Sequence, residues 1–199
     1  SKTAFAKNGI LMKEANFKET EIGKIPVDWE VKSIGEVAKE LIRGPFGGAL
    51  KKEIFVKSGY KVYEQRNAIY SNLEIGRYYI PHDKFKELQR FQILPKDFIL
   101  SCSGTIGRIF QIPENFEKGI INQALLIIRL DTKINSNYFE HIFKDVKVQK
   151  KIIDDTQGGA MKNLVGISEF KKTSFPLPPL PEQEKIAEVL SDTDLWIES

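Results

Sequence analysis

The 199-residue sequence has few residues that bind metals or form disulfides, with one cysteine, Cys102, and two histidines, His82 and His141. A single cysteine excludes a disulfide within the chain and a cysteine-rich zinc site, and it favours a reducing, cytoplasmic setting. No apolar run approaches the roughly 18 residues of a transmembrane helix, and the first residues lack the apolar region of a signal peptide. We therefore expect a soluble globular protein without a membrane partner.

Recognisable catalytic motifs are also absent. The sequence has no Walker loop, dinucleotide-binding glycine pattern or Gly-x-Ser-x-Gly elbow, and its two histidines do not have metal-ligand spacing. Asp131 with Asp145 and Lys147 matches the spacing of a metal-dependent nuclease loosely. However, Asp145 and Lys147 fall in a helical pattern, where residues two apart point in different directions. No catalytic residue and no metal ligand is therefore assigned, and Cys102 is interpreted as a small core or loop residue.

The formal net charge of +3 conceals an uneven distribution. Residues 1–42 are neutral, residues 43–172 hold 22 basic and 14 acidic side chains for a net of +8, and residues 173–199 have a net of −5. A basic body with an acidic tail suggests a polyanion as partner for one part and a different partner for the other. Chance variation along a solvated surface explains the charges alone equally well.

Hydrophobic periodicity predicts an α+β (mixed α/β) fold, with a small mixed or antiparallel β-sheet and flanking helices. Residues 1–24 are predicted to be a poorly structured lead-in, and Trp29 is predicted to be core. Helices are expected from a Ser33 cap to Ile42, over 83–89, and from Ser136 or Asn137 with an inner face that continues to Ile153. Short strands are expected at four places, namely 60–63, 98–101, 108–112 and 120–130.

The C-terminal segment combines a proline-rich junction with an amphipathic helix. Pro181 suits the first position of a helix, and Glu182 and Glu184 favour the positive end of its dipole. The apolar stripe that follows spans less than three heptads, which is too short to fold alone and needs a facing helix, either elsewhere in the fold or outside the chain. The stripe, which we predict to be a partner interface, consists of Ile186, Val189, Leu190, Thr193, Trp196 and Ile197.

Four polar loops carry amide, hydroxyl and guanidinium groups. They lie at 64–67, 101–108, 122–123 and 157–163. Gln and Asn can contact adenine edges, Arg can contact guanine, and glycines let a backbone approach a ligand closely. Each loop taken singly is explained by an ordinary turn, but four of them on a basic body favour a nucleic-acid interface.

Several stretches resemble the specificity subunits of type I restriction-modification systems. The run from Phe175 to Ala187 resembles the junction between a target-recognition domain and the conserved coiled-coil helix of that family. Four further stretches agree in the family's order, and these are 20–29, 44–52, 97–108 and 158–164. The resemblance covers roughly residues 17 to 199, and its proline-rich junction is its most specific part.

The resemblance implies a non-catalytic protein that recognises double-stranded DNA and directs other subunits to a split target. It divides the chain into a lead-in (1–24), a target-recognition domain (25–175) and a junction with the start of a coiled-coil spacer helix (176–199). The implied partners are methyltransferase subunits and a restriction subunit, with S-adenosylmethionine, ATP and Mg²⁺ on those subunits and none on this chain. Because the sequence shows one recognition domain, it is either a fragment or a half-length subunit that pairs with itself.

The resemblance and the loop chemistry together give a set of candidate DNA contacts. Phosphate contacts are predicted at Lys51, Lys52, Arg77, Arg108 and Lys162, and base or groove contacts at Gln65, Arg66, Asn67, Ser103, Thr105 and Asn163. Two other function classes remain open. One is a DNA-modifying enzyme in its own right, a nuclease or a methyltransferase, and the other is a scaffold that binds protein through the acidic helix.

Overall fold

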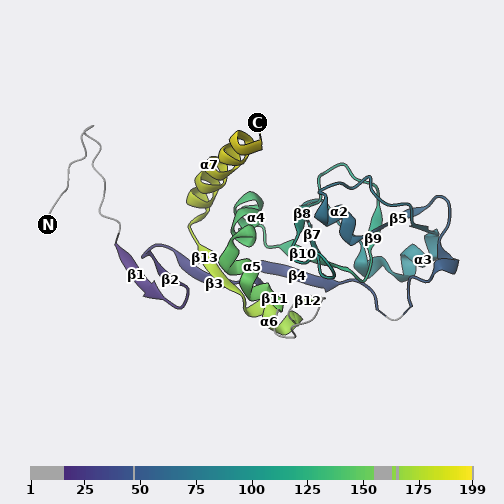
Figure 1. Cartoon of the computed structure of the whole chain (residues 1–199), viewed down its shortest axis with the longest axis horizontal. Helices are drawn as coiled ribbons and strands as arrows, with labels where there is room; N and C mark the ends of the chain where they lie inside the picture. Colours follow the sequence, from purple (N-terminus) through teal and green to yellow (C-terminus); the bar gives the residue numbers. More distant parts are fainter. Residues whose placement is uncertain (1–15, 47, 155–162, 165, 199) are drawn as a thin grey trace.

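A computed structural model describes residues 16–46, 48–154, 163–164 and 166–198 of the chain (Figure 1). A four-stranded antiparallel sheet lies at its centre, in the order β4-β10-β7-β8. Side chains of successive residues point to opposite faces of a strand, and both faces of this sheet are covered by hydrophobic cores. This explains why β7 and β10 are nearly continuous apolar runs. The strands are β4 (Ala38–Arg43), β7 (Phe98–Ser101), β8 (Ile109–Gln111) and β10 (Leu125–Leu130).

One face of the sheet packs against helices. Phe98 and Leu100 of β7 and Leu126 and Ile128 of β10 point into this core. Phe139 is fully buried in it, and its ring centroid lies 5.5 Å from that of Phe98. The helices that supply the other side of the core are α1 (Ile34–Val37), α4 (Ser136–Lys144), α5 (Val146–Ile152) and α6 (Ile167–Lys172).

The opposite face of the sheet packs against a second layer that extends away from the helices (Figure 1). Ile99, Leu125 and Ile127 point into this second core. A three-stranded mixed sheet in the order β6-β5-β9 belongs to this layer, with β5 parallel to β9. Its elements are β5 (Tyr60–Tyr63), β6 (Tyr79–Ile80), β9 (Gly119–Ile121), α2 (Gln65–Ile69), α3 (His82–Glu87) and the 3₁₀ turns η1 (Lys52–Ile54) and η2 (Gln89–Phe91).

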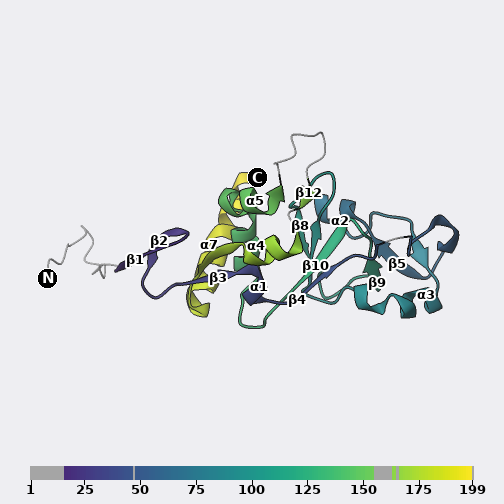
Figure 2. The same cartoon turned by 90° about the horizontal axis from the view of Figure 1, so that it is seen from below.

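The remaining elements lie at the other end of the molecule (Figures 1 and 2). A hairpin of β1 and β2 projects from the N-terminal side, and β3 pairs with β13 just before the C-terminal helix α7 begins. A short pair, β11 with β12, follows α5. The bounds are β1 (Phe17–Thr20), β2 (Gly23–Pro26), β3 (Glu30–Ser33), β11 (Ile153–Asp154), β12 (Asn163–Leu164), β13 (Ser174–Leu177) and α7 (Leu180–Glu198).

The α+β class and the small sheets with flanking helices are confirmed, but the predicted helix from Ser33 to Ile42 is wrong. Ser33 and Glu36 do form the expected capping box, yet the helix ends at Val37 and the chain continues as β4. Leu41 packs against one core and Ile42 against the other. Pairing with β10 buries Ile42 and half-buries Leu41, and this tertiary gain outweighs the local helical pattern.

Three other predictions need correction. The stretch 120–130 is two strands in different sheets, because a turn at Asn122 separates β9 from β10. The long helix after residue 135 breaks at Asp145, whose carboxylate caps α5, and Val146 is left 64% exposed. The cap of α4 is Asn135 rather than Ser136 or Asn137.

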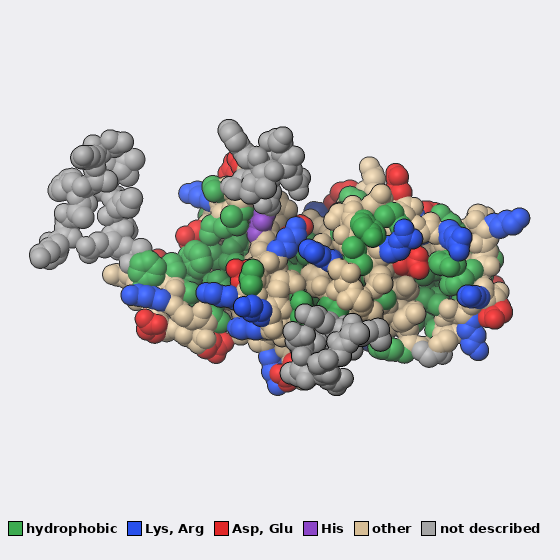
Figure 3. All heavy atoms as spheres, in the orientation of Figure 1, with side chains coloured by type: hydrophobic (Ala, Val, Ile, Leu, Met, Phe, Trp, Pro, Cys, Tyr) green, Lys and Arg blue, Asp and Glu red, His purple; other side chains and the backbone are tan. Residues whose placement is uncertain are grey.

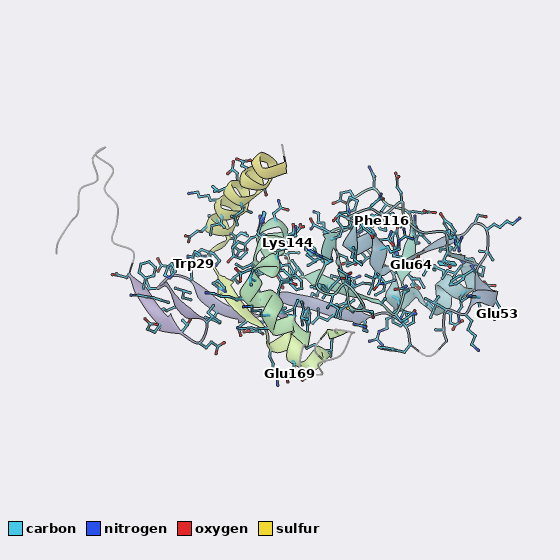
Figure 4. The ribbon with its side chains drawn as sticks, in the orientation of Figure 1. Trp29, Glu53, Glu64, Phe116, Lys144 and Glu169 are labelled. Atoms are coloured by element: carbon cyan, nitrogen blue, oxygen red, sulfur yellow. The ribbon has the colours of Figure 1, made fainter. Side chains whose placement is uncertain are left out.

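The N-terminal predictions are corrected in part. The described portion of the predicted lead-in is ordered as the β1–β2 hairpin. Trp29 is half-buried rather than core, and its indole Nε1 donates a hydrogen bond to Glu182 of α7 over 3.0 Å. Figure 4 labels Trp29 close to the start of α7. This tryptophan therefore connects the beginning of the domain to the C-terminal helix.

Candidate nucleic-acid interface

Two of the predicted polar loops meet the end of β4 and the residues after it at one end of the four-stranded sheet. We call this set, residues 43–46, 101–108 and 122–124, the loop edge. The backbone N–H of Gly44 donates to the carbonyl of Leu125 over 3.0 Å, and that of Cys102 donates to the carbonyl of Ala124 over 2.8 Å. The antiparallel order of β4, β10 and β7 accounts for this, because the end of β4 and of β7 lies beside the start of β10.

The first segment of the loop edge approaches the third with no room for a side chain. A Cβ on Gly44 would lie 1.8 Å from the carbonyl oxygen of Asn122. The Asn122 side chain in turn accepts a hydrogen bond from the N–H of Ala124 over 3.0 Å, which closes a tight turn. Glycine at position 44 is therefore required by close backbone contact between the two segments.

The loop between β7 and β8 is fixed at its base and exposed at its tip. The hydroxyl of Ser101 accepts a hydrogen bond from the N–H of Arg108 over 3.0 Å. Gln149 of α5 donates to the carbonyl of Gly107 over 3.3 Å. Thr105 and Arg108 are exposed and Ser103 is half-buried. The loop thus presents a hydroxyl and a guanidinium from a held backbone.

The start of α2 joins this loop through Gln65. A Cβ on Gly104 would lie 3.8 Å from Nε2 of Gln65. The Oε1 atom of Gln65 is buried and has no hydrogen-bond partner among the described residues. Arg66, the next residue, is exposed. The structure therefore brings Gln65 of α2 to the 101–108 loop, although the two segments come from different layers.

Asn67 is a correction to the predicted base contacts. Its side chain is fully buried, and its Oδ1 accepts a hydrogen bond from the N–H of Glu64 over 2.7 Å. Its Nδ2 donates to the carbonyls of Asn72 and Ile75 over 2.9 and 2.8 Å. Its Oδ1 thus caps the start of α2 and its Nδ2 holds the loop that follows, so Asn67 has a structural role and is not assigned to DNA.

The other predicted contacts lie outside the loop edge or outside the described residues. Lys51 and Lys52 are exposed near η1, and Figure 4 labels their neighbour Glu53 at the end of the molecule opposite β1. Arg77 is exposed, with its guanidinium carbon 5.7 Å from the centroid of the Tyr78 ring. Lys162 lies outside the described residues, and Asn163 belongs to β12 without a described side chain.

The loop edge also includes an arginine that the sequence analysis does not assign. Arg43 ends β4 directly before Gly44, and its Nε is buried without a hydrogen-bond partner among the described residues. The sequence predicts a helix that ends at Ile42, directly before this residue, and so indicates no role for it. A basic residue next to a glycine-rich loop was the one signal that could have identified it.

Cys102 lies within the loop edge but is not a nucleophile candidate. Its side chain is buried, and burial raises the pKa of the thiol to about 12, although the charge of Arg43 opposes this. The prediction of a small core residue is therefore confirmed. Among the residues that the structure describes, no group of His, Cys, Asp or Glu side chains is placed to hold a metal ion.

Charge is distributed along the molecule rather than gathered at one place. On the face shown in Figure 3, Lys and Arg side chains occur along its whole length, interleaved with Asp and Glu. Arg129 of β10 illustrates a neutralised arginine, since its guanidinium binds both Asp97 oxygens over 2.8 Å and also contacts Glu40. Basic residues without such partners are therefore the informative ones for anion binding.

Among the described residues of α7, the buried ones do not belong to the predicted partner interface. Gln183 and Ala187 are buried on the side that packs against α4, and the Ser191 hydroxyl lies 3.2 Å from Nε2 of His141. In the predicted stripe, Ile186 is half-buried, whereas Val189 and Leu190 are 64% and 40% exposed. Residues Thr193, Trp196 and Ile197 are helical, without described side chains.

Comparison with known proteins gives a consistent match. The family model "Type I restriction modification DNA specificity domain" matches residues 26–199. The chain is 30% identical over 188 residues to the putative type I restriction enzyme MjaX specificity subunit of Methanocaldococcus jannaschii, covering 92% of this chain and 43% of that protein. It is 27% identical over 181 residues to the EcoKI specificity subunit of Escherichia coli K12, covering 84% and 36%.

Solved structures share the fold at low sequence identity. The HsdS subunit from Thermoanaerobacter tengcongensis aligns with a TM-score of 0.63 at 16% identity, over 92% of this chain and 41% of that one. A chain from a structural study of type I R-M system assembly aligns with a TM-score of 0.67 at 15% identity, over 87% and 40%. The chain thus spans less than half the length of these relatives. None of the described helices is long and apolar enough to cross a membrane.

Proposed function

Because this chain belongs to the family of type I restriction modification DNA specificity domains, we propose that it recognises a short sequence of double-stranded DNA as one recognition unit of a specificity subunit. The observation that supports this most is the convergence of the 101–108 loop and the start of α2 at one end of the central sheet. Two segments that are far apart in the sequence then present polar side chains to the same ligand.

Base contacts are assigned to the part of this surface that is held most firmly. Gln65, Arg66, Ser103 and Thr105 carry the amide, guanidinium and hydroxyl groups that can pair with base edges in the major groove. Their backbones are fixed by the capping box of α2 and by the bonds at the base of the 101–108 loop. A rigid backbone lowers the entropic cost of ordering these side chains on DNA.

Phosphate contacts position the domain without reading sequence. Arg108 is exposed beside the base-contact candidates. Arg77 follows Gly76, where a Cβ would lie 3.7 Å from the carboxylate of Glu64 at the start of α2. Lys51, Lys52 and Lys162 complete the proposed phosphate contacts, and Asn163 is proposed as a base or groove contact.

The whole assembly is a further part of the proposal. We assign methyltransferase subunits and a restriction subunit as protein partners, with S-adenosylmethionine, ATP and Mg²⁺ bound by those subunits and not by this chain. The acidic helix α7 suits a protein partner, because six acidic residues and one basic residue in 173–199 repel DNA. If the chain is a natural half subunit, self-pairing through α7 gives a symmetric target.

Replacement of Arg66 by Ala tests whether this surface reads sequence. If Arg66 contacts a base, Arg66→Ala relaxes the preference at one position of the bound sequence, at a cost of about 1–3 kcal/mol for the preferred base. Competition between duplexes that differ at single positions measures this. Lys18→Ala on the distant β1 strand is the control and leaves the preference unchanged. Equal weakening of all duplexes would instead make Arg66 a phosphate contact.

A methylation assay separates the recognition unit from a DNA-modifying enzyme. The purified chain is incubated with DNA and S-adenosylmethionine, alone and together with a methyltransferase subunit of a type I system. The proposal predicts methyl transfer only in the second reaction. Transfer by the chain alone would contradict it and favour the enzyme.

A further inference from the structure

A groove beside the edge strand β4 carries positive charge that nothing in the described protein neutralises. It has a volume of about 560 Å³, and the residues that line it include Leu41, Arg43, Phe46, Arg90 and Ile167 of α6. Among the described side chains that line it, two are arginines and none is acidic. The groove is therefore suited to an anion.

Neither arginine has a protein partner in the part of the chain that the structure describes. Arg43 forms no hydrogen bond or ion pair there, and its Nε is buried and unsatisfied. Arg90 is exposed and likewise unpaired among those residues. Arg129, on the neighbouring strand, is by contrast neutralised by Asp97 and Glu40. Since a buried unpaired guanidinium nitrogen is costly, Arg43 is better explained by an anionic ligand than by the fold alone.

The groove also has an apolar wall that the fold does not cover. Phe46 is 72% exposed and Ile167 is 39% exposed. A bare phenyl ring beside two guanidinium groups matches a nucleotide, in which a phosphate adjoins an apolar sugar face and a base that can stack. A free inorganic anion would use only the arginines.

The groove is continuous with the loop edge. Gly44, on its floor, packs against the backbone of Asn122. The positive charge of Arg43 also acts to lower the pKa of Cys102, which belongs to the 101–108 segment. A DNA strand that contacts the exposed tip of the 101–108 loop can therefore extend as far as the groove.

We propose that this groove binds one backbone phosphate of the DNA between Arg43 and Arg90, with Phe46 packed against the adjoining sugar or base. The assignment rests on the proposed function, since it supplies a positioning contact for the same DNA. It adds Arg43, Phe46 and Arg90 to the interface, and it gives Arg43 the partner that the protein lacks.

Salt dependence of DNA binding tests the groove. The probe is a 30-bp duplex of fixed sequence, and its affinity for the full chain is measured by fluorescence anisotropy between 50 and 200 mM salt. Loss of one phosphate contact lowers the slope of log K against log salt by about 0.9 and weakens binding roughly ten-fold at low salt. Arg90→Gln and Arg43→Gln are each expected to do this on every duplex sequence.

Three further variants make the test specific. The double variant Arg43→Gln/Arg90→Gln should lose less DNA-binding free energy than the sum of the two single losses, because both residues bind the same phosphate. Phe46→Ala weakens binding but keeps the salt slope, since it removes no charge. Lys18→Gln, which removes one charge from the distant β1 strand, is the matched control and keeps the wild-type affinity.

Three outcomes would overturn the assignment of the groove as a phosphate site. If the wild-type chain binds duplex DNA and Arg90→Gln keeps its affinity and slope, the groove is not a phosphate site, although the proposed function stands. If Arg90→Gln instead abolishes binding of a methyltransferase subunit and not of DNA, the groove is a protein-docking site. If the wild-type chain binds no duplex, the proposed function fails and the groove assignment fails with it. Because Arg90 is exposed, misfolding does not confound its variant.

Discussion

At the residue scale, exposure decides which members of a polar motif can meet DNA. Gln65, Arg66 and Asn67 are neighbours with similar chemistry, yet Asn67 is fully buried and Arg66 is exposed. Sequence reveals the amide and guanidinium groups but not the carbonyls of Asn72 and Ile75 that engage Asn67. Arg43 is the opposite case, because the sequence assigns it no role although it lines a groove. That groove is formed by segments distant in sequence.

The buried carboxylate of Asp97 is expected to be the most sensitive charged residue of the fold. It is 2% exposed, and it accepts two hydrogen bonds from Arg129 and one from the N–H of Leu94. Asp97→Ala removes the buried partner of the Arg129 guanidinium and leaves Glu40 as its remaining carboxylate. This should lower the free energy of unfolding by about 3 kcal/mol, measured by urea denaturation. Glu114→Ala, which removes an ion pair with Lys96 that is exposed on both sides, should leave it nearly unchanged.

The thiol of Cys102 gives a prediction that depends on pH. Burial raises its pKa from 9.0 to about 12, so the native protein has almost no thiolate at pH 8. A thiol reagent should therefore modify Cys102 slowly in buffer and rapidly in urea, as followed by mass spectrometry. The raised pKa also means that the stability contributed by the neutral thiol is complete below pH 9 and falls as pH rises toward 12. Rapid modification of the folded protein at pH 8 would show that the loop edge opens.

At the element scale, the elements that sequence predicts correctly are those with a strong local signal. The strands β5 and β7, the helix α3 and the start of α7 near Pro181 all lie within a residue or two of their expected positions. Errors occur where pairing between distant segments determines the secondary structure. An example is β4, for which local periodicity predicts a helix. The two-layer arrangement of both cores around one sheet has no signal in the sequence, because it depends on strand order.

The attachment of α7 to the domain depends on one buried glutamine. Gln183 is 2% exposed, its Oε1 accepts a hydrogen bond from the N–H of Asn135 over 3.0 Å, and its Nε2 donates to the carbonyl of Pro178 over 2.8 Å. Gln183→Ala leaves both groups unpaired and should cost about 1–3 kcal/mol of stability, with faster hydrogen exchange at the start of α7.

A conservative variant and a neighbour control this prediction. Gln183→Glu keeps the acceptor for Asn135 but turns a carboxylate oxygen toward the Pro178 carbonyl at a buried position, so its unfolding temperature near pH 7 should be no higher than that of Gln183→Ala. Lys185→Ala, an exposed change on the same helix turn, should match the wild type. A Gln183→Ala protein with unchanged unfolding and exchange would mean that packing against α4 suffices to hold α7.

At the scale of the whole molecule, the small net charge of +3 results from a basic body and an acidic C-terminal segment. The structure separates them, because α7 leaves the domain beside β13 while the loop edge lies at the end of the central sheet. This separation allows one molecule to bind DNA through its body and protein through its helix. The expectation of these two partners came from charge order and family resemblance, whereas the location of the DNA surface required the fold.

The central claim is that the loop edge and the start of α2 together read DNA sequence. The measurement that tests it most directly is selection by the wild-type chain from a pool of random duplexes at 50 mM salt, followed by sequencing of the bound fraction. The account predicts enrichment of one short motif, and a weaker preference at one of its positions when the selection is repeated with Arg66→Ala. Recovery of all sequences in their starting proportions by the wild-type chain would contradict it.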